Sequence, residues 1–228
     1  MTQLVVQNLT FNFANGQVGN RDIDHISKFV KNVWVNDFTY TFEYGKSYML
    51  FGLPQNASWT IAWIIGGLLD ADSGMISKDG KPFIIEQRRK ESWFVIEDEI
   101  KQFGFLQKSV RWQVRQGINS TSEVVLDDLL IRQHFMLTPE RYNRPLRQMS
   151  SEKWRASMAI GFAHGKQIFC FPHLKLVDEK YDLLEEYGDL WLHRTIKFLC
   201  NKGAIILIPS VNLDTEKYFD EVVFTVAD

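Results

Sequence analysis

Three short segments of the chain are almost wholly apolar, and they limit the possible folds more than any other feature. They lie at residues 47–51, 167–171 and 204–208. Such segments are typical of strands buried on both faces, as in a parallel sheet that helices cover on each side. Segments with helical periodicity lie between them, at residues 58–69, 151–164 and 181–201. The pattern predicts an α/β fold with a largely parallel sheet.

Weaker patterns complete this prediction. Strands are expected at residues 4–13, 38–42 and 222–226, and a hairpin turn at Asp79 and Gly80. Helices are expected at residues 21–36 and 122–135, and a helical turn at 215–219. Residues 86–102 are charged and predicted to be exposed, and a solvated loop is favoured over a binding patch for Arg88, Arg89 and Lys90. Because there is no internal repeat or linker, residues 1–228 are expected to form one domain.

The composition argues against several classes of protein. The 228 residues carry a net charge of −2, so no basic field supports nucleic-acid binding. No apolar run approaches the ~20 residues of a membrane span, and no signal peptide is visible, so a cytoplasmic protein that meets the membrane through a partner is expected. Cys170 and Cys200 have apolar surroundings, and two free buried thiols are favoured over a disulfide. No cysteine–histidine spacing suggests a metal site.

The apolar segment at residues 47–51 leads into a glycine-containing turn and then a helix, which is the setting of a phosphate-binding loop. The working motif is G-x-x-x-x-G-K-[S/T]. Its backbone N–H groups hold the phosphates, its lysine neutralises them, and its hydroxyl binds Mg²⁺. In this chain Gly52 opens the motif and Thr60 closes it. Between them, Ala57, Ser58 and Trp59 replace the second glycine, the lysine and the magnesium-binding residue.

The flanks of this loop resemble those of ABC transporter ATPases. Residues 42–47 resemble the strand and turn that lead into the family's phosphate loop, and residues 64–76 resemble its segment from the loop helix into an antiparallel subdomain. Residues 78–81 fit the hairpin that follows. The resemblance extends over nearly the whole chain. It implies a P-loop NTPase-like ABC ATPase fold with a parallel core sheet, an antiparallel β subdomain and a helical subdomain at roughly residues 108–165.

Two later segments resemble motifs of that family without their functional residues. Gln107 stands one residue early in the segment whose glutamine contacts the membrane subunit in the family. Met149 and Ser150 fit the start of the signature L-S-G-G-Q. Ser151 and Glu152 do not supply its glycines, so the resemblance implies a degenerate signature.

The last two motifs also depart from the family. Pro172 and His173 stand where the resemblance places the magnesium-binding aspartate and the catalytic glutamate. Ser210 is followed by Val211, where active members carry a histidine. Phosphoryl transfer depends on positioning and on stabilisation of developing charge, which these side chains do not offer. The five altered chemical positions are Ser58, Trp59, Pro172, His173 and Val211.

Loop conformation gives a second argument. The glycines of a phosphate loop allow positive φ and close approach of the backbone. Gln55 and Ala57 would cost ~1 kcal/mol or more each in a left-handed conformation. No cofactor and no metal are therefore expected, while binding of ATP and Mg²⁺ stays open as an alternative. The predicted degenerate loop comprises Gly52, Gln55, Asn56, Ala57, Ser58, Trp59 and Thr60.

Several single residues admit two interpretations. For Trp59, plain core packing is favoured over a side chain that plugs the site. For His173, an unconstrained turn is favoured over a substitute base. For Phe11 and Phe13, which lie near where family members stack an aromatic ring on adenine, strand core is favoured.

The resemblance leads to one main hypothesis and two alternatives. The main hypothesis is a catalytically inactive ABC ATP-binding subunit with a structural or regulatory role in a membrane transport complex. Its partners would be a membrane permease, docked near residues 100–120, and an active ATPase subunit or a second copy of the chain. One alternative is a soluble scaffold that reuses the fold. The other is an ATPase with residual activity, in which a cation such as Lys46 or Arg155 reaches the phosphate site.

Overall fold

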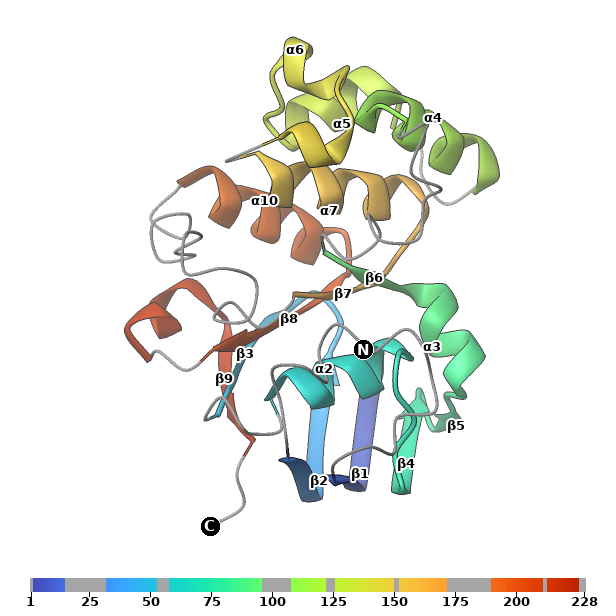
Figure 1. Ribbon diagram of the computed structural model, residues 1–228, viewed down its shortest axis with the longest axis vertical. Coiled ribbons are helices and arrows are strands. Elements are labelled where there is room, and N and C mark those ends of the chain that lie inside the picture. Colours follow the sequence, from blue (N-terminus) through green and yellow to red (C-terminus); the bar gives the residue numbers. More distant parts are fainter. Residues whose placement is uncertain are drawn as a thin grey trace.

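The fold is built around a parallel sheet in the middle of the molecule (Figure 1). The computed structural model describes residues 2–14, 32–52, 58–95, 108–121, 126–149, 152–171, 190–210 and 213–225. The strand order in the parallel sheet is β6-β7-β8-β3-β9. The strands are β3 (Ser47–Phe51), β6 (Ser92–Phe94), β7 (Ile168–Cys170), β8 (Ile205–Ser210) and β9 (Glu221–Phe224). All four neighbouring pairs are parallel, as the apolar segments predict.

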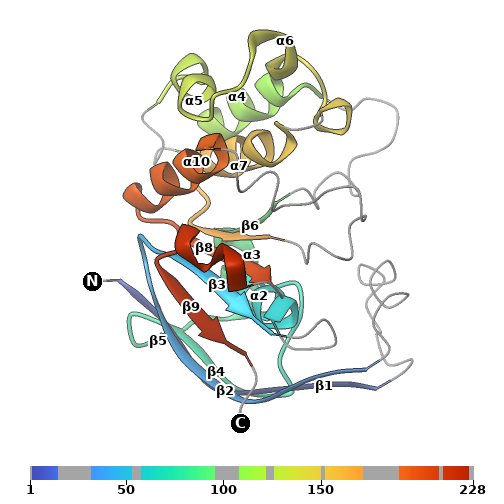
Figure 2. The ribbon, with the colours of Figure 1, turned by 90° about the vertical axis from the view of Figure 1, so that its left-hand side faces the viewer.

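A second, antiparallel sheet lies on one side of the parallel sheet (Figures 1 and 2). Its strand order is β2-β1-β4-β5. The strands are β1 (Gln3–Ala14), β2 (Asn32–Glu43), β4 (Ser73–Lys78) and β5 (Lys81–Pro82). Asp79 and Gly80 join β4 to β5 with φ angles of 51° and 75°, so the predicted hairpin turn is confirmed.

The helices form a layer on the other side of the parallel sheet, except for α2 and α3 (Figures 1 and 2). Helix α2 (Ser58–Gly66) lies between the two sheets and contacts β3, β7 and β8, and α3 (Ile85–Glu91) precedes β6. The helical layer contains α4 (Val110–Ser120), α5 (Asp128–His134), α6 (Pro139–Tyr142), η3 (Leu146–Gln148), α7 (Lys153–Ala163) and α10 (Leu190–Asn201). A 3-10 helix, η4 (Leu213–Tyr218), leads into β9.

Two hydrophobic cores lie on opposite faces of the parallel sheet, and β8 shows why its strands are continuously apolar. Its side chains alternate between the cores. Ile206 and Ile208 belong to the core under the helical layer, while Ile205 and Leu207 belong to the core shared with α2 and the antiparallel sheet. A polar residue at either kind of position would lose hydration without gaining a partner.

Three sequence expectations differ in part from the structure in this region of the molecule. The prediction of a helix at residues 21–36 is wrong for its last five residues, because the strand β2 begins at Asn32. The rest of that prediction lies outside the described chain, which omits residues 15–31. The exposure expected for residues 86–102 holds for Glu86, Gln87, Arg89 and Lys90 of α3. It fails for Arg88 and for the strand β6, whose first two residues are buried. Helix α4 was not identified as a separate element, although it lies within the helical subdomain predicted at roughly residues 108–165; its buried residues Val110, Val114 and Gly117 follow a helical spacing.

The two arginines of the supposed solvated loop cap the carboxyl end of α2. Arg88 is buried, donates a hydrogen bond to the carbonyl of Ile64, and pairs with Asp70 at 3.0 Å. Arg89 donates to the carbonyl of Gly67 at 3.1 Å. Cations here satisfy the terminal carbonyls and complement the negative end of the helix dipole. The pair therefore fixes the end of α2 that points away from the phosphate loop.

Both cysteines are free and buried. Burial raises the pKa of the Cys200 thiol to about 12, so that thiol stays protonated near neutral pH. No helix in the described ranges is both long enough and apolar enough to cross a bilayer.

Replacing the cap should weaken the fold measurably. We expect Arg88→Met to lower the free energy of unfolding by about 2–3 kcal/mol, since it removes two hydrogen bonds and leaves the Ile64 carbonyl without its capping donor. In a chain of this size that is a fall in Tm of roughly 5–10 °C, measurable by circular dichroism. Lys90→Met, at an exposed position of the same helix, is the control and should change Tm by about 1 °C or less. Equal effects of the two substitutions would contradict the capping role.

Candidate functional site

The predicted loop and the end of the last apolar strand meet at the carboxyl edge of the parallel sheet. The amide of Gly52 donates to the carbonyl of Ser210 at 3.2 Å. The amide and hydroxyl of Thr225 donate to the carbonyl of Phe51 at 3.0 and 3.1 Å. Because β3, β8 and β9 are parallel, their carboxyl ends gather at one edge, which is where ligands bind in α/β folds.

Helix α2 starts at this edge, and its first turn is wholly buried. Ser58 and Thr60 have no exposed surface, and Trp59 is 4% exposed. The chain contains no Lys, Arg, His, Asp or Glu anywhere from residue 47 to residue 69. The helix is apolar on all sides, which is typical of an element packed between two layers.

Four buried polar atoms in α2 have no hydrogen-bond partner among the residues that the structure describes. They are the hydroxyls of Ser58 and Thr60 and the indole N–H groups of Trp59 and Trp63. The two indole rings pack edge to face, with centroids 4.5 Å apart and planes at 75°. Each unpaired buried polar group lowers stability by roughly 1–3 kcal/mol. The pairing of Trp59 with Trp63 was not foreseen, although their spacing of four residues on a helix is the signal for it.

These residues can be tested against the magnesium nucleotide that the resemblance implies. A triphosphate needs a cation to neutralise it and an accessible oxygen for Mg²⁺. The described part of the loop offers two hydroxyls, both without exposed surface, and no charged side chain. These residues do not fit a magnesium nucleotide, and we derive no reaction step through one.

The described residues of the predicted signature, Met149 and Glu152, belong to the helical layer. Met149 is buried in the core under the helical layer. Glu152 stands at the start of α7, and its carboxylate accepts a hydrogen bond from the Thr138 amide at 3.2 Å and lies 3.8 Å from the Arg141 guanidinium. The start of α7 therefore carries a buried carboxylate of the chain itself, a feature that the sequence did not indicate.

The remaining predicted site residues lie outside the described chain. They are Gln55, Asn56, Ala57, Gln107, Ser150, Ser151, Pro172, His173 and Val211. Of the two aromatic residues near the expected adenine position, Phe11 is partly buried against the core. The side chain of Phe13 is also outside the described part.

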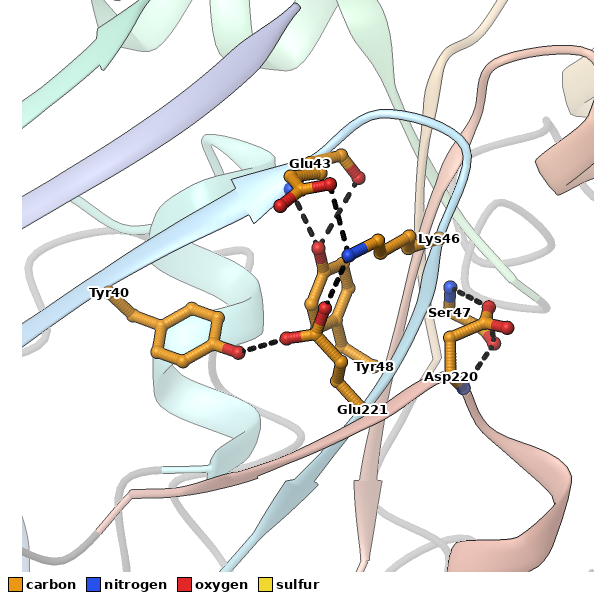
Figure 3. A network of polar contacts seen from close by, with 7 residues as sticks. All are labelled: Tyr40, Glu43, Lys46, Ser47, Tyr48, Asp220 and Glu221. Atoms are coloured by element: carbon orange, nitrogen blue, oxygen red, sulfur yellow. Dashed lines mark hydrogen bonds and ion pairs between the residues drawn. The ribbon is translucent and has the colours of Figure 1, made fainter. Parts of the chain in front are cut away.

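Lys46 was one of two cations suggested as a substitute for the missing lysine, and it lies at the opposite end of β3 from Gly52 (Figure 3). Its ammonium donates to Glu221 at 2.7 Å and pairs with Glu43 at 3.0 Å. The five residues of β3 span about 16 Å, so Lys46 does not reach the loop. Tyr40 donates to the second oxygen of Glu221 at 2.5 Å.

The network in Figure 3 instead joins the two sheets. Tyr40 belongs to β2 of the antiparallel sheet and Glu221 to β9 of the parallel sheet. In the same network the amide and hydroxyl of Ser47 donate to Asp220 at 2.8 and 2.7 Å. The network therefore holds the edge strand β9 beside β3, which is a structural role.

Arg155, the second suggested substitute, is also engaged elsewhere. It is buried in α7 and donates to the backbone carbonyls of Met136 at 2.6 Å and Phe135 at 3.4 Å. These bonds hold the end of α5 against α7. Neither cation is placed to serve the loop.

No protein-family model matches the chain. A protein of Treponema denticola, whose assigned name is that of an ABC transporter ATP-binding protein, is 27% identical over 161 residues, which are 68% of this chain and 32% of that protein. The chain thus spans about a third of the length of the curated relative it matches.

Solved structures establish the fold. The structure of cbiO1 from Clostridium perfringens, part of the ABC transporter complex cbiONQ, matches 97% of this chain and 83% of its own, with a TM-score of 0.67 and 16% identity. A dimeric ATP-binding cassette in a post-hydrolysis state, bound to ADP and Pi, matches 97% of this chain and 94% of its own, with a TM-score of 0.64 and 13% identity. The chain therefore has the fold of ABC transporter ATPases, as its sequence predicts.

The unpaired hydroxyls of α2 lead to a prediction about stability. Thr60→Val keeps the shape of the side chain and removes a buried hydroxyl without a partner. We expect Tm to stay constant or to rise by up to about 4 °C. Thr195→Val is the matched control, because that buried hydroxyl donates to the Trp191 carbonyl at 2.9 Å, and its removal should lower Tm by about 1–4 °C. A clear fall in Tm for Thr60→Val would mean that its hydroxyl has a partner in solution.

The Glu221 network leads to a prediction about pH. The hydrogen bond from Lys46, and then that from Tyr40, lowers the pKa of Glu221 below its ordinary value. Such a group stabilises the fold above its unfolded pKa of roughly 4.3, and the contribution is lost as pH falls through the folded pKa. Glu221→Gln should therefore lower Tm by about 2–4 °C at pH 7, and the difference from wild type should shrink as pH falls below the unfolded pKa and through the lower folded pKa.

Thermal unfolding followed by circular dichroism at pH 7, 5, 4 and 3 measures this difference. Glu140→Gln, at an exposed position of α6, is the control and should match wild type throughout. A deficit for Glu221→Gln that stays constant down to pH 3 would show that the ionised carboxylate is not its source.

Proposed function

We propose that the chain is a catalytically inactive ATP-binding-type subunit of an ABC transport complex, with a structural or regulatory role. The burial of Ser58, Trp59 and Thr60 in an uncharged loop region is the observation that supports this most directly. Hydrolysis would require charge stabilisation at the phosphates. Two buried hydroxyls and two paired indoles do not supply it.

The start of α7 supports the same proposal. In the family that the sequence resembles, two cassettes meet face to face, and the signature of one completes the nucleotide site of the other. In this chain Glu152 places a carboxylate at that helix start, held by Thr138 and near Arg141. A buried carboxylate engaged within the chain offers no donor to the phosphates of a partner's nucleotide. The chain would therefore complete a partner's site poorly.

A membrane permease is the partner that we infer. The cbiO1 protein of the same fold is part of a transporter complex. On the helical layer of this chain, Trp112 of α4 and Leu129 and Leu130 of α5 are 46%, 51% and 41% exposed. Exposed apolar side chains that lie close together on a surface favour a protein interface.

The surroundings of these apolar residues also fit an interface. Asp128 pairs with Arg111 at 2.9 Å and with Arg115 at 3.0 Å, which joins α4 to α5. The ion pairs thus hold α4 and α5, the two helices that carry these exposed side chains, against each other. An interface of this kind places apolar residues at its centre and ion pairs at its rim.

Both alternatives to this proposal remain testable. An ATPase with residual activity is disfavoured, because Lys46 and Arg155 are engaged elsewhere. A soluble scaffold that reuses the fold would have no membrane partner, and this separates it from the proposal.

Co-purification tests the proposed function. The tagged full chain, expressed in its native cells, should be recovered from detergent extracts of membranes with a membrane protein in fixed stoichiometry, as judged by mass spectrometry. Trp112→Ala with Leu129→Ala should reduce that recovery at least fivefold. Trp34→Ala with Ile84→Ala, two equally exposed apolar residues on other elements, is the matched control and should leave recovery unchanged. Recovery without any membrane protein would sink the proposal and favour the scaffold.

A further inference from the structure

Helix α10 has one outward side that combines aromatic and basic residues. We call this side the α10 face and define it as Trp191, Arg194, Lys197, Phe198 and Lys202, the last in the turn after the helix. Trp191 is 45% exposed, and Arg194, Lys197 and Lys202 are also exposed. The opposite side of α10 packs into the core under the helical layer through Leu192, Ile196 and Leu199. Figure 2 shows α10 at the edge of that layer.

Two of the three cations of the α10 face lie over aromatic rings. Arg194 lies over the Trp191 ring at 5.3 Å, and Lys202 lies over the Phe198 ring at 5.9 Å. The Phe198 ring also stacks on His134 of α5, with centroids 4.5 Å apart. These ring contacts order the cations and leave their charge uncancelled, since a ring quadrupole carries no net charge.

Several cations on other described elements are paired with carboxylates. Lys46, Lys78, Arg88, Arg111 and Arg115 each form an ion pair within the described chain. By contrast, residues 190–203 contain no Asp or Glu.

Among the described residues, the Asp220 carboxylate acts electrostatically on this region. Asp220 opposes the fall in the pKa of His193 that burial causes. Its carboxylate, however, already accepts two hydrogen bonds from Ser47. The α10 face itself carries three cations, Arg194, Lys197 and Lys202, and no carboxylate, on a chain whose total charge is −2.

We propose that the α10 face binds an acidic peptide segment of a partner protein. Opposite charge on the partner supplies the attraction, and Trp191 supplies an aromatic anchor of the kind enriched at interfaces. The twelve residues of α10 span about 18 Å, which an extended segment of five or six residues matches. A long polyanion or an anionic membrane would also meet the remaining surface of this net acidic chain, so a short segment is favoured. This inference does not depend on whether the chain binds a nucleotide.

Fluorescence anisotropy with the full chain tests the proposal. The probe is a fluorescein-labelled peptide of four glutamates and two leucines. The triple variant Arg194→Glu, Lys197→Glu, Lys202→Glu should weaken binding at least tenfold. The triple variant Lys81→Glu, Lys90→Glu, Arg147→Glu makes the same charge change at exposed positions elsewhere and should weaken it less than threefold. Trp191→Ala should weaken binding about threefold without any change of charge.

The other possible results would overturn either the site or the class of partner. Equal losses for the two triple variants, or no loss for either, would overturn the α10 face as the site. Tighter binding of a single-stranded oligonucleotide, or of vesicles that contain phosphatidylserine, would overturn the assignment of a peptide partner. If the first triple variant does not fold, as judged by circular dichroism, the single variants Arg194→Gln and Lys197→Gln take its place. Each should weaken binding at least twofold, and no effect of either would overturn the proposal.

Discussion

Helix α2 lies between the parallel and antiparallel sheets, and all nine of its residues are buried. Much of the structure depends on that packing. The sheet strands β7 and β8 direct alternate side chains toward it, and the antiparallel sheet closes the core around it from the other side. A helix enclosed in this way cannot accept a charged residue without a partner, because the charge would lose its hydration. The uncharged stretch from residue 47 to residue 69 satisfies that constraint.

The two ends of α2 differ in a way that bears on function. Its carboxyl end has two arginine donors, from Arg88 and Arg89. Its amino end has no charged side chain in the described residues, only unpaired hydroxyls and a pair of tryptophans. In a phosphate loop the amino end of the helix is the part that meets the ligand. In this chain the described part of the same end is buried with apolar neighbours. This burial is what supports the proposal that the loop does not recognise a phosphate.

The fold could be predicted from the sequence to a large extent, because buried strands and loop flanks leave strong local patterns. The apolar runs predicted β3, β7 and β8, and the resemblance around Gly52 predicted the order of the subdomains. The contacts of Arg88 and Glu152 could not be predicted in this way. A charged residue in a short segment looks solvated unless its distant partner is known, and Arg88 meets Ile64 and Asp70 only through the folded chain. Lys46 does not replace the lysine of the phosphate loop for a different reason. It precedes β3, whereas the loop follows β3, so the length of the strand separates them.

A subunit that does not hydrolyse ATP would act through the surfaces that bind its partners. The two candidate surfaces of this chain lie on the helical layer: the apolar residues of α4 and α5, and the α10 face. Both ideas are separate from the central claim, which concerns the buried amino end of α2. Isothermal titration calorimetry of the purified full chain with ATP and Mg²⁺, up to millimolar concentration, tests that claim most directly. The account predicts no heat beyond that of dilution. A saturable heat with one site per chain would contradict it, because the first turn of α2 would then have to open and admit a triphosphate.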